Sequence, residues 1–188
     1  MHKILWPLLL MILGLPLIAQ SAASIRLEPL FGVEHSQNQF PEPARYSTRS
    51  FFGLRALAGY TLLSAELEAT QSNDRRDYPS ENLKVEDQIR RAMVGLRSTY
   101  ALSHFLGFYL RAGARGTEEK NTITNTNTSV VEVKNPGIKW DPYAGTGLQI
   151  AFAQNFALNG GATWIFTGAS KPDVQYSFGF TVKFGQVR

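Results

Sequence analysis

The chain has 188 residues, a formal net charge of +4 at pH 7 and no cysteine. This length suits one domain, and the modest, scattered positive charge does not indicate a nucleic-acid partner. The lack of cysteine excludes disulfides and thiolate metal sites, so non-covalent contacts must stabilise the fold.

Residues 1–23 are predicted to be a cleavable signal peptide. Lys3 precedes an apolar run over residues 4–19, and the small residues Ser21, Ala22 and Ala23 follow it. This order of a basic start, a short apolar core and small residues is typical of secretory signals. We expect cleavage after Ser21 or Ala23, which leaves one domain at residues 24–188. An uncleaved anchor helix is the alternative, disfavoured by the two prolines within the run.

Eight segments then alternate between apolar residues and small or polar ones. The side chains of a strand alternate between two faces, so this period of two predicts β-strands. In chain order the expected strands are 24–37, 51–58, 62–70, 88–100, 104–115, 143–152, 156–166 and 174–184. Pro29 is expected to mark a local bulge, because proline cannot donate a hydrogen bond to a ladder.

The connections between these strands alternate between long and short. We expect short turns at 59–61, 101–103 and 153–155, and longer loops at 38–48, 72–87, 116–141 and 167–173. Bacterial outer-membrane barrels have an even number of strands, short periplasmic turns and longer external loops. The pattern therefore predicts an all-β fold, an eight-stranded antiparallel up-and-down transmembrane barrel. Within the third loop, residues 130–133 are expected to extend a strand past the membrane.

The last strand has the strongest alternation. Every second residue from Val174 to Phe184 is apolar, and most of these are aromatic, while the residues between them are small or polar. A soluble barrel with an apolar cavity would show the same alternation, but with the apolar face toward the cavity and the polar face toward water. The polar face carries glycines and long charged side chains, and an Arg facing lipid at mid-depth costs roughly 2–4 kcal/mol. The apolar face is therefore assigned to lipid.

This orientation predicts three groups of site residues. A charge network is expected in the lumen, formed by Glu28, Arg55, Glu66, Glu68, Arg97 and Arg111. An aromatic girdle is expected at the membrane boundaries, formed by Tyr60, Tyr100, Phe156, Trp140, Tyr143, Trp164, Phe166 and Tyr176. The aromatic residues of the last strand are expected to act as an assembly signal, namely Tyr176, Phe178, Phe180 and Phe184.

Several of these segments resemble a known family. Hairpins of small outer-membrane barrels are similar to four parts of this chain: Gly53-Leu54-Arg55 with Gly59-Tyr60, residues 63–69, residues 145–149 and residues 155–158. The family meant is that of the transmembrane domain of outer membrane protein A and its loop-variable surface relatives. The last strand resembles the signal read by the barrel-assembly machinery, although that family usually ends on the aromatic residue and here residues 185–188 follow. The resemblance implies an architecture rather than an activity.

The function expected from these features is a structural or surface-interaction role in the bacterial outer membrane, carried by the external loops and without catalysis. We expect a monomer in contact with outer-membrane lipid and lipopolysaccharide, with no cofactor, no metal and an unidentified extracellular ligand. A narrow pore lined by the lumen arginines is one alternative. The other is a lipid-modifying enzyme that uses His35, although the neighbouring Ser36 must face the opposite side of the strand.

Overall fold

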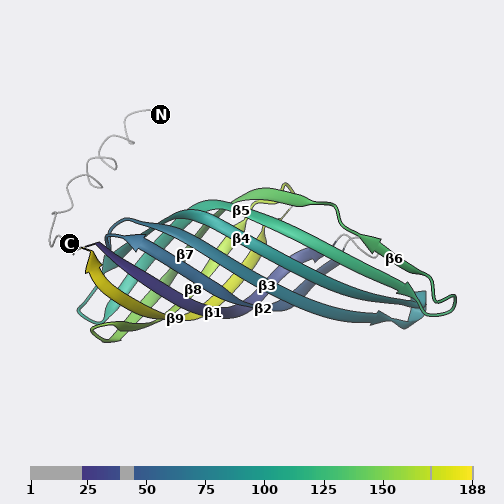
Figure 1. Ribbon diagram of the computed structural model, residues 1–188, viewed down its shortest axis with the longest axis horizontal. Coiled ribbons are helices and arrows are strands. Elements are labelled where there is room, and N and C mark those ends of the chain that lie inside the picture. The colour runs from purple at the N-terminus through teal and green to yellow at the C-terminus, as the bar shows by residue number, and fades with distance from the viewer. Residues whose placement is uncertain (1–22, 39–44, 170, 188) are drawn as a thin grey trace.

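The computed structural model describes residues 23–38, 45–169 and 171–187, and it forms a single antiparallel barrel (Figure 1). The predicted signal peptide falls on residues that are not described, except for Ala23, which begins the first strand. No helix in the described ranges is long and apolar enough to cross a membrane, a finding that does not bear on strands.

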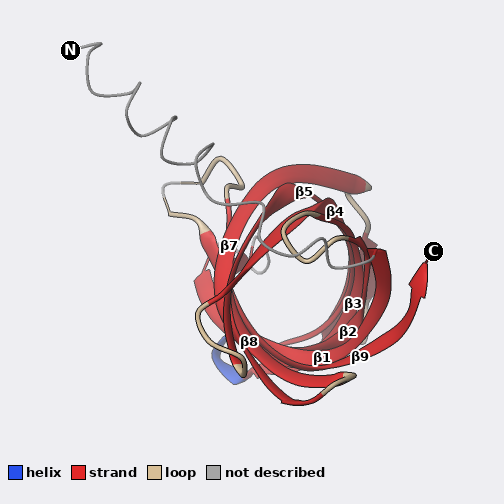
Figure 2. Cartoon of the chain, turned by 90° about the vertical axis from the view of Figure 1, so that its left-hand side faces the viewer, coloured by secondary structure: helices blue, strands red, loops and turns tan. Residues whose placement is uncertain are grey.

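Eight strands form the closed ring, and each pairs with its two neighbours in antiparallel fashion. Around the ring these are β1 (Ala23–Asn38), β2 (Arg45–Gly59), β3 (Ser64–Tyr78), β4 (Leu83–Ala101), β5 (Leu106–Asn125), β7 (Ile138–Ala153), β8 (Phe156–Ile165) and β9 (Asp173–Val187). Pairing of β1 with β9 closes the ring, as the view along the barrel shows (Figure 2). The predicted eight-stranded antiparallel barrel is confirmed.

The outward side chains of the ring form an apolar belt. Its members are exposed although they are large and apolar, and they include Phe31, Leu54, Leu67, Val94, Leu110, Leu148, Leu158 and Phe178. The side chains between them point inward and are buried, and most of them are polar or charged. This arrangement is the reverse of a soluble barrel, and it suits a barrel that has hydrocarbon around it. The interior also holds apolar side chains, including Leu57, Met93 and Ile165.

Four strands project beyond the belt on one side of the barrel, and they form what we call the projecting sheet. The β3–β4 hairpin stays paired up to Tyr78 and Leu83, where the short helix η1 (Pro79–Glu81) joins the strands. β5 follows β4 up to Asn125 and also pairs with the short strand β6 (Val131–Lys134). In Figure 1 these strands reach well past the ends of the other strands, at the end opposite the C-terminus.

The projecting sheet corrects two predicted loops. Most of 72–87 and most of 116–141 are strand, so the connections there are only residues 79–82, 126–130 and 135–137. The loop predicted at 38–48 also shortens, because β1 reaches Asn38 and β2 starts at Arg45. The strand expected at residues 130–133 corresponds to β6.

The bulge predicted at Pro29 was wrong. The β1–β2 register runs without a shift through Pro29 and Leu54, and the irregularity in the β1–β9 ladder lies between Ser24 and Ile25. Pro29 instead points outward, where its missing N–H leaves the pairing with β9 interrupted. It borders an apolar groove of about 630 Å³ in the wall, together with Phe31, Phe52 and Phe178.

Candidate functional site

The lumen contains the six charged residues predicted for it, and they form one ion-paired group that we call the deep cluster. Glu28 lies between Arg55 at 3.0 Å and Arg97 at 2.9 Å, and it also accepts a hydrogen bond from Thr181 at 2.8 Å. Glu68 accepts from Arg55 and Arg111, each at 2.8 Å. Glu66 lies 2.7 Å from Arg111 and 3.8 Å from Arg55. Three carboxylates thus neutralise three guanidinium groups.

These contacts join strands that are not neighbours in the ring. The Arg97–Glu28 pair connects β4 to β1, and Arg111 on β5 reaches the two glutamates of β3. All six side chains are almost completely buried. The deep cluster therefore fills the cross-section of the lumen with side chains, as expected for an eight-stranded barrel.

Two tyrosines complete this layer, and glycines make room for both. Tyr109 lies under the Arg97 guanidinium, which is 3.8 Å from the ring centroid, and its ring packs against the backbone at Gly147 and Gly161. A side chain at either glycine would overlap the Tyr109 ring or hydroxyl. Tyr143 donates a hydrogen bond to Glu66 at 3.1 Å, and its hydroxyl occupies the space left by Gly95.

A second group of charges, which we call the mouth cluster, lies toward the projecting sheet. Glu34 on β1 accepts from Arg91 at 2.8 Å and from Arg115 at 3.1 Å. Arg115 also lies 3.4 Å from Asp173, and Arg49 pairs with Asp87 at 3.2 Å. The parity of Arg91, Arg115 and Glu34 was visible in the sequence. Asp87 and Asp173 fell in predicted loops, however, and Arg49 fell between a predicted loop and the following strand, so this cluster was missed.

The structure places most of the predicted girdle residues on the outward face. Tyr60, Trp140, Trp164, Phe166, Tyr176 and Phe156 are exposed, and Tyr100 is half-buried. Tyr143 was assigned wrongly, because its side chain is only 2% exposed and points into the lumen. Its parity with Gly145 and Gly147 was the signal that would have placed it inside.

The residues predicted as an assembly signal share the outward face of β9. Tyr176, Phe178 and Phe184 are exposed, and Phe180 is half-buried between the rings of Phe152 and Phe156. β9 continues beyond Phe184 to Val187 and pairs there with Ala23.

His35 and His104 both lie at exposed positions. His35 points outward, stacks on Tyr46 at 5.3 Å and lies 3.2 Å from the Thr48 hydroxyl, whereas the buried Ser36 points inward. His104 is exposed beside Phe105 in a turn. Across the described residues, no group of three or more histidines and carboxylates is arranged to hold a metal ion.

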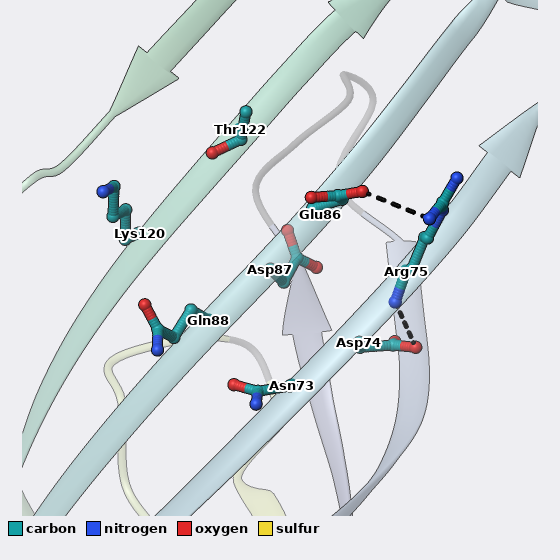
Figure 3. Close-up of a pocket in the computed structure, with 8 residues that line it drawn as sticks. All are labelled: Asn73, Asp74, Arg75, Glu86, Asp87, Gln88, Lys120 and Thr122. Atoms are coloured by element: carbon teal, nitrogen blue, oxygen red, sulfur yellow. Dashed lines mark hydrogen bonds and ion pairs between the residues drawn. The ribbon is translucent and has the colours of Figure 1, made fainter.

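The outer face of the projecting sheet carries a polar groove of about 380 Å³ (Figure 3). Asn73 and Arg75 on β3, Glu86 and Gln88 on β4, and Lys120 and Thr122 on β5 line it, with Asp74 and Asp87 behind. Arg75 pairs with Glu86 at 3.5 Å. The exposed Arg90 and Lys120 border an adjoining hollow and form no ion pair within the described residues. The groove therefore offers amides, a hydroxyl, the Lys120 ammonium group and the Arg75–Glu86 ion pair to solvent, and the adjoining hollow adds Arg90 and Glu118.

Behind this groove, Asp87 connects the mouth cluster to the projecting sheet. It accepts from Arg49 and also from Arg76 at 3.1 Å. Burial raises the pKa of the Asp87 carboxyl above its ordinary value, although both arginines act against the rise. The pKa of Arg76 is also raised: burial opposes this, but Asp74 and Asp87 together outweigh it.

A second pocket, of about 580 Å³, lies at the barrel mouth between the ends of β5, β7 and β9. Its charged lining residues are Arg115, Glu119, Lys139, Asp141 and Asp173. Lys139 bridges it by bonding Asp141 at 3.2 Å and the backbone oxygen of Thr167 at 2.8 Å. Arg115 also pairs with Asp173, so most charges of this pocket are neutralised within it.

Comparison with known proteins identifies the fold. No protein-family model matches the sequence, and no curated protein matches it. Among solved structures, OprG of Pseudomonas aeruginosa matches with a TM-score of 0.57 at 11% identity, over 87% of this chain and 96% of that one. Ail of Yersinia pestis matches with 0.56 at 12% identity, over 87% and 99% of the two chains. Neisserial surface protein A matches with 0.55 at 15% identity, over 87% and 98%.

At these identities the likeness is one of fold, and the chain has the fold of the small outer-membrane β-barrels. The resemblance inferred from the sequence is confirmed at that level. A closed barrel with an apolar belt and a charged lumen is the architecture of bacterial outer-membrane proteins, and we therefore assign the barrel to that membrane.

Proposed function

We propose that this chain is a non-enzymatic surface protein of the outer membrane and that it binds an extracellular saccharide with anionic groups on the projecting sheet. The observation that carries the proposal is the polar groove of Figure 3, on strands that continue past the apolar belt. With the three short turns in the periplasm, the projecting sheet lies outside the cell.

The side chains of the groove favour this class of ligand. Arg90 and Lys120 are exposed cations without an ion-pair partner among the described residues, and Asn73, Gln88 and Thr122 supply neutral hydrogen-bonding groups around Lys120. Sulfate and phosphate groups form charge-assisted hydrogen bonds with such cations, whereas amides and hydroxyls pair with sugar hydroxyls.

One structural neighbour is compatible with the same ligand class. Ail of Yersinia pestis has been solved in complex with the heparin analogue sucrose octasulfate, in a structure that matches this chain with a TM-score of 0.57 at 12% identity. That ligand belongs to Ail, and it supplies the probe for a test of this chain.

The other expected partners belong to the same proposal. The outward residues Arg90 and Gln71 follow the last apolar belt positions on β4 and β3, at the depth where lipopolysaccharide head groups begin. We expect a monomer that contacts outer-membrane lipid and lipopolysaccharide and that the barrel-assembly machinery inserts. The absence of catalysis is also proposed, and it is supported by the opposite orientations of His35 and Ser36.

The test is binding of the barrel, embedded in lipid nanodiscs, to immobilised heparin. Wild type should bind, and the Arg90→Gln/Lys120→Gln variant should bind at least about tenfold more weakly, because each charge-assisted hydrogen bond contributes about 1.5–3 kcal/mol. The matched control is Lys139→Gln/Lys171→Gln, which removes the same charge outside the groove. Failure of wild type to bind heparin or dextran sulfate, or an equal loss in both variants, would refute the proposal.

A further inference from the structure

Arg26 is a buried cation that forms no ion pair with any residue that the structure describes. Its side chain is 5% exposed and points into the barrel from near the start of β1, at the turn side, which is the end of the barrel where the three short turns lie. Its Nε and Nη2 atoms are buried and donate no hydrogen bond to any atom in the described ranges. Among the arginines whose side chains the structure describes, every other inward-facing one forms at least one ion pair.

The two carboxylates whose charges act on Arg26 are already paired with other arginines. Glu28 and Glu66 both belong to the deep cluster, where three carboxylates neutralise Arg55, Arg97 and Arg111. Arg26 is therefore a charge in excess of this group. The mouth cluster shows no such surplus, because Glu34, Asp87 and Asp173 match Arg49, Arg91 and Arg115.

A second cation lies directly beside Arg26. Lys183 on β9 is its cross-strand partner in the β1–β9 register, and Lys183 has the same inward parity as Thr181. The Lys183 side chain forms no ion pair with any part of the chain that the structure describes. Like charges placed directly opposite each other on neighbouring strands destabilise a sheet, so two adjacent unpaired cations indicate a missing anion.

We propose that Arg26 and Lys183 form an anion-binding site at the turn-side mouth of the barrel and that its ligand is a phosphate group. A guanidinium fork beside an ammonium group matches the oxygens of a phosphate, and an uncompensated buried charge is strongly destabilising. The phosphate belongs either to a phospholipid head group of the inner leaflet or to free inorganic phosphate. This proposal does not depend on ligand binding by the projecting sheet.

The test is reversible urea unfolding of the barrel in maltoside detergent micelles, whose head groups carry no phosphate, with inorganic phosphate varied at constant ionic strength. Above the dissociation constant, each tenfold rise in phosphate should raise the folding equilibrium constant of wild type by about tenfold. Arg26→Gln should abolish this dependence, and Lys183→Gln should weaken it. The matched control is Lys171→Gln, which removes one exposed positive charge elsewhere and should respond as wild type does.

Two further arms identify the source of the phosphate and guard against a variant that fails to fold. Micelles mixed with phosphatidylglycerol should stabilise wild type without added phosphate if the ligand is a lipid head group, and should have no effect if it is free phosphate. In micelles with neither phosphate nor phospholipid, Arg26→Met should be more stable than wild type, because it removes the surplus charge. A wild type indifferent to both phosphate and phosphatidylglycerol, or an Arg26→Gln variant that responds as Lys171→Gln does, would overturn the proposal.

Discussion

Removal of the Glu28 charge should destabilise the barrel far more than removal of an exposed carboxylate. Glu28 is 1% exposed and receives contacts from Arg55, Arg97 and Thr181, all within 3.0 Å. Glu28→Gln keeps the shape, but it leaves the deep cluster with one positive charge in excess. Its new amide N–H groups also face these donors.

The magnitude follows from burial. Loss of one partner of a buried ion pair costs about 3–5 kcal/mol, and we expect about 3 kcal/mol because the remaining amide oxygen keeps part of the contacts. That value is about a 150-fold change in the folding equilibrium constant. Glu86→Gln, at a carboxylate that is 55% exposed and 3.5 Å from Arg75, should cost no more than about 1 kcal/mol.

The assay is urea unfolding in detergent micelles, followed by tryptophan fluorescence. The double variant Glu28→Gln/Arg97→Gln restores a neutral cluster, with Glu66 and Glu68 facing Arg55 and Arg111. It should therefore lose less stability than the sum of its single variants. If Glu28→Gln unfolds at the same urea concentration as Glu86→Gln, the lumen charges are hydrated and the account of a dry, ion-paired interior is wrong.

Three further predictions test other parts of the fold. Gly161→Ala should cost about 1–3 kcal/mol in the same unfolding assay, because its methyl group overlaps the Tyr109 hydroxyl. The adjacent Gly160→Ala meets only Phe178 at an ordinary 3.5 Å and should change stability by less than about 0.5 kcal/mol. Equal effects of the two variants would show that the glycines do not make room for Tyr109. The pKa of Asp87 is raised above 3.8, so ionisation of this carboxyl disfavours the folded state. The stability of wild type relative to Asp87→Asn should therefore increase as the pH falls through the pKa that Asp87 has in the folded protein. A stability difference between the two proteins that does not change with pH would contradict this. Planar-bilayer recordings should show no conductance steps, since the deep cluster crosses the lumen; regular steps abolished by Arg97 substitution would favour the pore.

The sequence predicted the parts of this fold that lipid contact dictates. Period-two alternation located all eight strands of the ring, and the parity of Glu28, Arg55 and Arg97 placed them in the lumen, because an apolar belt needs a polar interior. The prediction of a bulge at Pro29 was wrong because a proline on the outward face only interrupts the β1–β9 ladder. Tyr143 was placed in the girdle because it is aromatic, although its position in the alternation, shared with Gly145 and Gly147, predicted an inward side chain.

Outside the membrane the same signal is lost. On β4 beyond Arg91 the inward residues include Val85 and Ile89, whereas the outward ones are Glu86 and Gln88, so the apolar face reverses where solvent replaces lipid. A strand that faces water on its outer side resembles a charged loop in composition. The alternation of Val85, Asp87 and Ile89 with polar residues was the available signal, and it would have extended β3 and β4 into the projecting sheet.

The measurement that tests the central claim most directly is cysteine labelling on intact cells. The chain has no cysteine, so each introduced thiol reports one position without background. Glu86→Cys lies in the projecting sheet, and Ser103→Cys lies in the turn between β4 and β5 at the opposite end. A membrane-impermeant maleimide should label Glu86→Cys in intact cells and Ser103→Cys only after the outer membrane is opened. If only Ser103→Cys is labelled in intact cells, the barrel is inserted the other way round. If neither variant is labelled until the outer membrane is opened, the projecting sheet does not form a binding surface outside the cell.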